Sequence, residues 1–177
     1  VEVKGNELPG LDGSGEDYSR AIEKVGLEIQ SSPREYYEIK EPIYLDFKNA
    51  SAVILPFDGL KVSYTLSYGS EALEDQFLET VINEEMFRRE IAPARTFVLK
   101  EEAEALIAKG YGKGADFKNT LVFENNKPMN NQLRFRNEAV RHKVFDLIGD
   151  LYLLGYRLKG HVITSRTGHS HNLKMVL

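Results

Sequence analysis

The sequence has 177 residues, of which 42% are hydrophobic and 28% are charged, so it can form one good core or two small ones and lacks the bias of a disordered or fibrous chain. Its net charge of -4 lacks the basic excess that a nucleic-acid groove needs, so nucleic-acid binding is not expected. The absence of cysteine excludes disulfides and thiolate metal sites, and any metal must therefore be held by His, Asp or Glu.

An amphipathic helix is predicted from about Gly15 to Gln30, after a strand end at Val1–Val3 and a turn-rich segment at residues 5–15. Ser14, with Asp17 three residues later, resembles a capping box. Apolar residues recur at helical spacing, namely Tyr18, Ile22, Val25 and Ile29. Polar residues and a proline stop this helix at residues 31–34, which form the predicted linker between two domains.

Three runs rich in β-branched and aromatic residues predict an antiparallel sheet after the linker. They span residues 37–47, 52–57 and 60–68, and a tight turn at residues 57–59 is predicted between the last two. A fourth strand is predicted near residues 76–82. Asn83 is then expected to cap a short helix that continues through Arg89.

The second half of the chain mixes helices and strands. Its predicted helices span residues 100–109, 138–154 and 168 onward, and its predicted strands span residues 120–124 and 160–166. Gly110 and Gly155 end the first two helices. The predicted fold class is α+β, with two-layer domains in which a small, largely antiparallel sheet packs on helices.

The longest apolar runs, Ala52–Phe57 and Leu151–Leu154, are far shorter than the roughly 20 residues that cross a bilayer. We therefore expect a soluble protein of the cytoplasm. The chain begins without Met inside a predicted strand and ends inside a predicted helix. We therefore also expect it to be a piece of a longer protein.

The long helix carries the strongest chemical pattern. His142, Asp146 and Asp150 lie four residues apart and share one helix face, among apolar residues that indicate a mostly buried helix. Burying two carboxylates and an imidazole costs several kcal/mol unless a metal or opposite charges compensate. The alternative is a solvated or hydrogen-bonded surface pair, which is common for His and Asp at this spacing.

A second polar cluster lies near the end of the chain, at residues 168–172, with His161 before it. One of the three histidines His161, His169 and His171 could act as an acid or base, because histidine titrates near neutral pH, and Asp150 could orient it. The alternative is that these are ordinary polar residues between a strand and a helix. Spacing alone does not decide between the two interpretations.

Two further segments carry polar or flexible residues. Thr96 could donate its hydroxyl to a developing oxyanion and Arg95 could form an ion pair, but both could equally be ordinary strand residues. The loop at residues 110–114 reads Gly-Tyr-Gly-Lys-Gly, yet it lacks the Gly-Lys-Ser/Thr ending of a phosphate-binding loop.

Four segments match the motifs of one protein family in the right order. They are Leu11–Gly15, Ala94–Phe97, residues 140–155 (VRHKVFDLIGDLYLLG) and Gly168–Ser170 with Asn172 after it. In these segments the chain resembles the UDP-3-O-acyl-N-acetylglucosamine deacetylases. The resemblance implies zinc-dependent hydrolysis of the N-acetyl group of UDP-3-O-acyl-N-acetylglucosamine, the committed step of lipid A synthesis for the Gram-negative outer membrane.

The resemblance also implies residue roles at the reacting centre. His142 and Asp146 would be zinc ligands, and zinc would activate water and polarise the carbonyl. His169, held by Asp150, would stabilise the intermediate or protonate the leaving amine. Thr96 would hydrogen-bond the oxyanion.

The same resemblance implies contacts with the rest of the substrate. Lys143 would contact the diphosphate, and Phe97 would pack near the substrate. The acyl chain would lie along an apolar channel that includes Leu106 and Phe117.

The family architecture implies two similar domains with their helices sandwiched between outer sheets. Residues 1–34 would then end the first domain, and residues 35–177 would form the second, with an insert at about residues 92–119. The family takes its third zinc ligand and its general-base Glu from an upstream His-x-x-Glu-His segment that this chain lacks, so we expect the chain alone to be incomplete and inactive. The rival hypotheses are a non-catalytic nucleotide-sugar-binding relative and another metal-dependent amide hydrolase.

Overall fold

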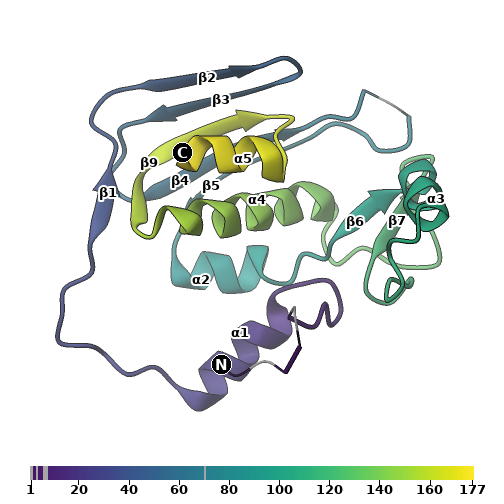
Figure 1. The fold of residues 1–177 in the computed structure, drawn as a ribbon, viewed down its shortest axis with the longest axis horizontal. Coiled ribbons are helices and arrows are strands. Elements are labelled where there is room, and N and C mark those ends of the chain that lie inside the picture. The colour runs from purple at the N-terminus through teal and green to yellow at the C-terminus, as the bar shows by residue number, and fades with distance from the viewer. Residues whose placement is uncertain (1, 3, 6–7, 70) are drawn as a thin grey trace.

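The computed structural model describes residues 2, 4–5, 8–69 and 71–177. The strand end predicted at Val1–Val3 rests on Val1 and Val3, which lie outside this part of the chain. Within the described residues, six strands form the main sheet: β1 (Tyr36–Glu38), β2 (Ile43–Phe47), β3 (Ala50–Leu55), β4 (Leu60–Leu66), β5 (Gln76–Ile82) and β9 (Arg157–Ser165). The open sheet packs against helices, which confirms the predicted α+β class (Figure 1).

Strand β9 lies at the centre of the main sheet, whose order is β2-β3-β9-β4-β5. The sequence predicts β3 and β4 as hairpin neighbours around residues 57–59, and this prediction is wrong because β9 lies between them. β9 runs antiparallel to β3 and parallel to β4, and its first residues pair with β1. The turn at residues 57–59 instead crosses from one side of β9 to the other, and the amide of Gly160 on β9 donates to the carbonyl of Gly59 at 2.8 Å.

Two helices near the C-terminal end, α4 (Glu138–Leu151) and α5 (His169–Val176), lie side by side next to the main sheet (Figure 1). The core forms where α4 packs on β4 and β5, because each element turns its apolar face toward the other. Its fully buried side chains include Val62, Tyr64, Val140, Val144, Leu147 and Val162. This contact fixes the position of the helix that carries the predicted metal ligands.

A second, smaller sheet is formed by the part of the chain between β5 and α4. It contains β6 (Phe97–Leu99), β7 (Leu121–Glu124) and β8 (Lys127–Pro128), and α3 (Lys100–Ala108) packs on β6 and β7. β6 and α3 fall inside the predicted insert at residues 92–119. The predicted domain boundary near residue 34 stays a prediction.

Several predicted helix ends agree with the structure. The Oδ1 of Asn83 accepts the amide of Met86 at 2.8 Å and caps α2 (Glu84–Met86), which continues as a π-helical turn η1 (Phe87–Ile91). α4 passes into the 3-10 turn η2 (Tyr152–Leu154) and ends at Gly155, whose φ of 79° suits glycine.

The first helix, α1 (Glu16–Val25), is shorter than the predicted span from Gly15 to Gln30. It ends at Gly26, which has a φ of 86°. The predicted capping box at Ser14 is wrong, since the residue before the helix is Gly15 and the hydroxyl of Ser14 instead donates to Asp12 at 2.7 Å. None of the helices among the described residues is long and apolar enough to span a membrane.

A buried ion pair joins α4 to the segment before β6. The Glu138 carboxylate is fully buried and accepts from the Nε of Arg95 at 2.8 Å, from the backbone amide of Arg95 at 3.1 Å and from the amide of Arg134 at 2.6 Å. Of the two interpretations that the sequence leaves open for Arg95, the structure thus supports the ion pair. The Nη2 of Arg95 also donates to the carboxylate, so the buried charges of the pair are compensated within the interior.

Replacing Glu138 with Ala should lower the free energy of unfolding by about 3–5 kcal/mol, because it leaves the Arg95 guanidinium buried without its partner. The matched control is Glu85→Ala, which breaks the exposed Glu85–Arg89 pair and should cost less than about 1 kcal/mol. Urea denaturation followed by circular dichroism measures both. Equal losses in the two variants would contradict the structural role of the buried pair.

Candidate functional site

The buried face of α4 presents a histidine and a carboxylate to each other. The Nδ1 of His142 lies 3.0 Å from the carbonyl oxygen of Ala94, which can only accept, so Nδ1 carries the proton. The Nε2 of His142 then faces the Oδ1 of Asp146 at 3.3 Å. A neutral imidazole therefore leaves two acceptor atoms close together, and a cation between them would relieve the repulsion.

Burial lowers the pKa of His142, although the neighbouring Asp146 carboxylate acts in the opposite direction. The neutral ring is thus favoured, and neutral imidazole is the form that binds a metal. His142 and Asp146 fit a zinc site in ligand type, but they supply two protein ligands. In the part of the chain that the structure describes, no cluster of three or more His, Cys, Asp or Glu side chains is arranged to hold a metal ion.

Asp150, one turn further along α4, makes different contacts. Its Oδ2 lies 2.8 Å from the Nδ1 of His169 and accepts the amide nitrogen of Asn172 at 2.9 Å, and both partners come from α5. The side chain of His169 is 65% exposed, so this bond, and not packing, orients the ring. The structure thus brings Asp150 and His169 together, while the catalytic role of His169 stays a prediction.

The carboxylate of Asp146 also lies close to two other candidate residues. The Nζ of Lys143 donates to its Oδ2 at 2.8 Å, and the Nε2 of His169 lies 3.9 Å from the same oxygen. His142, Lys143, Asp146, Asp150 and His169 therefore form one polar cluster along α4 and the start of α5, which we call the α4 cluster. It can hold a cation on one side and present an imidazole to solvent on the other.

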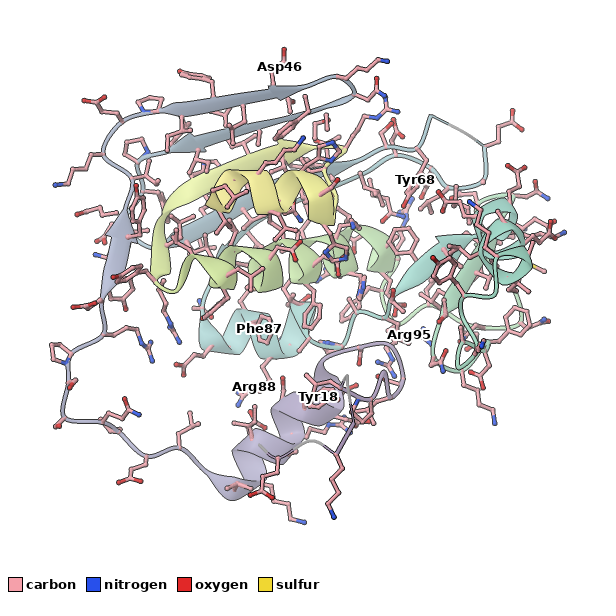
Figure 2. The ribbon with its side chains drawn as sticks, viewed as in Figure 1. Tyr18, Asp46, Tyr68, Phe87, Arg88 and Arg95 are labelled. Atoms are coloured by element: carbon pink, nitrogen blue, oxygen red, sulfur yellow. The ribbon has the colours of Figure 1, made fainter. Side chains whose placement is uncertain are left out.

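The segment Ala94–Phe97 lies beside this cluster. Besides the Ala94 carbonyl, it contributes Phe97, whose ring meets His142 edge-to-face at 6.5 Å between centroids. The backbone of Thr96 is held on both sides, since its amide donates to the Gly13 carbonyl at 2.7 Å and its carbonyl accepts from Leu121 at 2.9 Å. The residue 11–15 loop and the second sheet thus fix this segment, with Arg95 between them (Figure 2).

The two predicted acyl-channel residues are solvent-exposed in this structure. Leu106 on α3 is 45% exposed, and Phe117 in the following loop is 42% exposed. Their role in acyl binding stays a prediction.

A cavity of about 340 Å³ opens next to the α4 cluster. Its lining includes Tyr68, Lys143, Arg166, Ser170 and His171. Lys143 and Arg166 make it suited to an anion. Sequence analysis assigned no role to Arg166 or to Asn172. The placement of Asn172 one helical turn after His169 is a signal that could have indicated a shared partner.

A larger, mainly apolar cavity of about 680 Å³ lies along another part of α4. Phe87 of η1 lines it together with Phe145, Ile148 and Tyr152, and Phe87 is marked in Figure 2. It contains none of the residues of the α4 cluster, so we do not assign it to the same site.

Comparison with known proteins gives a consistent result. The sequence model of the family described as UDP-3-O-acyl N-acetylglycosamine deacetylase matches residues 1–177. Three similar curated proteins, all named UDP-3-O-acyl-N-acetylglucosamine deacetylase, come from Aquifex aeolicus (44% identity over 177 residues), Chlamydia pneumoniae (39% over 175) and Thermodesulfovibrio yellowstonii (35% over 176). The matches cover 99%, 98% and 99% of this chain and 61%, 62% and 60% of those relatives, so the chain spans about 60% of their length.

Inorganic pyrophosphate should bind the full-length protein in the cavity that Lys143 and Arg166 line. Lys143→Met and Arg166→Met should each weaken binding by about tenfold, because each removes a charged hydrogen-bond donor to the anion. Lys174→Met is the control, since this lysine lies on α5 over the ring of Phe47 and does not line the cavity. Calorimetric titration would contradict the assignment if all three variants lost the same affinity.

Proposed function

The chain belongs to the UDP-3-O-acyl N-acetylglycosamine deacetylase family, and on that premise we propose that the whole protein hydrolyses the N-acetyl group of UDP-3-O-acyl-N-acetylglucosamine in lipid A biosynthesis. The observation that carries this proposal is the pair formed by His142 Nε2 and Asp146 Oδ1, two acceptor atoms 3.3 Å apart, while Lys143 binds the other carboxylate oxygen, Oδ2, of Asp146. A metal-dependent hydrolase needs such a pair of donor atoms.

We propose Zn²⁺ as the cation that His142 and Asp146 hold. Zinc bound there would supply a Lewis acid for the amide carbonyl and for water. The Ala94 carbonyl supports this assignment from the other side of the ring, because it fixes the tautomer that leaves Nε2 free to bind the metal. The third protein ligand and a general-base Glu would come from the part of the whole protein that this chain does not contain.

His169 is proposed as the general acid. Amide hydrolysis releases acetate and an amine, and the nitrogen must gain a proton as the carbon–nitrogen bond breaks. His169 is exposed enough to reach a substrate, while Asp150 holds its Nδ1 and leaves Nε2 free to give a proton. The Thr96 hydroxyl is proposed to donate a hydrogen bond to the developing oxyanion. The backbone of Thr96 is hydrogen-bonded on both sides, which would keep this hydroxyl in place.

The remaining assignments concern substrate binding. Lys143, with Arg166 across the same cavity, is proposed to bind the diphosphate, because two cations match its charge. Phe97 packs against His142 and would contact the sugar or the acyl chain. Leu106 and Phe117 offer exposed apolar surface that an acyl chain could cover. A location in the cytoplasm is proposed on the same family grounds.

His142→Ala in the full-length protein should remove bound zinc and lower kcat/KM for the deacetylase reaction by about a thousandfold, because the Lewis acid is lost. Zinc content by mass spectrometry and acetate release measure the two effects. His161→Ala is the control, since His161 hydrogen-bonds Ser63 on β4 and neither belongs to the α4 cluster nor lines the anion cavity. Unchanged activity in His142→Ala would exclude this enzyme assignment. Nucleotide-sugar binding without acetate release by the wild-type protein would favour the non-catalytic relative.

His169→Gln should lower kcat by about 10²–10⁴-fold with zinc content unchanged, since it removes the acid but neither metal ligand. Asp150→Asn should act in the same direction and more weakly, because the imidazole stays while its orienting carboxylate is lost. Steady-state acetate release at saturating substrate measures kcat. A His169→Gln enzyme with wild-type kcat would assign the proton to another group.

Substrates that lack the 3-O-acyl chain separate this proposal from a more general amide hydrolase. The proposed enzyme should turn them over much more slowly, because binding energy from the acyl chain is lost. Equal kcat/KM for the acylated and non-acylated substrates would favour the general metal-dependent amide hydrolase.

A further inference from the structure

Residues 166–168 form the turn between β9 and α5. This turn lines the anion cavity and leads directly into His169 of the α4 cluster. Arg166, Thr167 and Gly168 all line the cavity, and His169 follows directly as the first residue of α5. A shift of this turn would move the proposed acid and a proposed phosphate ligand together. What holds the turn therefore matters for both.

The conformation of the turn is not one that its residues favour on their own. Arg166 has a φ of 59°, in the left-handed region that a side chain with a Cβ rarely adopts. Its amide is held by the Thr65 carbonyl on β4 at 3.0 Å. Such a backbone persists only where surrounding contacts stabilise it.

Tyr64, the neighbour of Thr65 on β4, holds the next residue of the turn. Its fully buried hydroxyl donates to the Thr167 carbonyl and accepts from the Thr167 hydroxyl at 3.3 Å. Burial raises the pKa of Tyr64 to about 12, so the phenol keeps its proton and remains a donor at neutral pH. This contact links strand β4 to the turn just before α5.

The orientation of the His169 ring depends on how the start of α5 is held. Its side chain is 65% exposed, so packing does not fix it, and its ring is oriented by one bond to Asp150. That bond can form at 2.8 Å only where the start of α5 lies at the correct distance from α4. The phenol of Tyr64 contributes to this spacing through Thr167, beside the bond from Asn172 to Asp150 and the packing of α5 on α4.

We propose that Tyr64 is a positioning residue for the reaction: its buried hydroxyl holds the residue 166–168 turn so that His169 meets Asp150 and Arg166 faces the anion cavity. The expected effect on catalysis rests on the proposed function. The claim that Tyr64 holds the turn and thereby the His169–Asp150 bond does not. Tyr64 touches no reacting atom and acts through the backbone of Thr167.

The test is Tyr64→Phe in the full-length protein, a change that removes one oxygen and keeps the ring that fills the core. We expect kcat to fall by about tenfold or more, because small misplacements of catalytic groups are costly, and KM to rise as well, because Arg166 shifts with the same turn. The bond between the His169 Nδ1–H and Asp150 should give a downfield proton resonance in the wild type, and Tyr64→Phe should lose or broaden it.

Two controls separate positioning from general stability. Tyr37→Phe makes the same chemical change at an exposed tyrosine of β1, and should leave kcat and the resonance unchanged. Val62→Ala removes buried volume from the same strand without touching the turn, and should lower Tm but not kcat. If Tyr64→Phe proves unstable, Thr167→Val, which removes only the 3.3 Å bond, should show a smaller loss of kcat and of the resonance.

The proposal is overturned if Tyr64→Phe keeps wild-type kcat and the His169 resonance, or if Val62→Ala loses as much kcat at the same Tm. If the wild-type protein releases no acetate, the proposed function fails. The resonance alone then decides the positioning role, because it does not depend on turnover.

Discussion

The buried carboxylate of Glu138 is the constraint on which the rest of the site depends. It lies at the start of α4, four residues before His142, and is bound by both the side chain and the amide of Arg95. Because an unpaired charge in this position would be very costly, the segment at Arg95 has little freedom to move away from α4. The carbonyl of Ala94 is thereby held against His142, and the imidazole tautomer follows from an ion pair that takes no part in chemistry.

His142, Asp146 and Asp150, which share one face of α4, differ in their burial and in their partners. His142 is buried and faces the largely buried Asp146, so a cation bound between them would be partly shielded from water. Asp150 lies nearer to α5 and binds His169 and Asn172 instead. The same four-residue spacing therefore places His142 and Asp146 as the proposed metal pair and Asp150 as the partner of His169, and the difference between them is set by which elements pack on each turn of the helix.

Elements defined by local signals could be predicted closely. The strand Gln76–Ile82, the cap at Asn83 and the helix end at Gly155 each depend on residues within a few positions of one another. The stripe of His142, Asp146 and Asp150 belongs to the same class, because helix geometry alone places these residues on one face. Helix α1 was harder to place, since its exposed apolar residues continue past the glycine that ends it.

The sequence by itself determined the family, the α+β class and the residues that face one side of α4, because motifs and helical periodicity are local properties of the chain. Only the tertiary structure decided that β9 enters between β3 and β4, that Arg166 shares a cavity with Lys143 and that Tyr64 binds Thr167. These contacts join residues more than twenty positions apart, and no local pattern encodes them. Their partners are chosen by burial, by the pairing of buried polar groups and by the need to fill one core, which act on the whole chain at once.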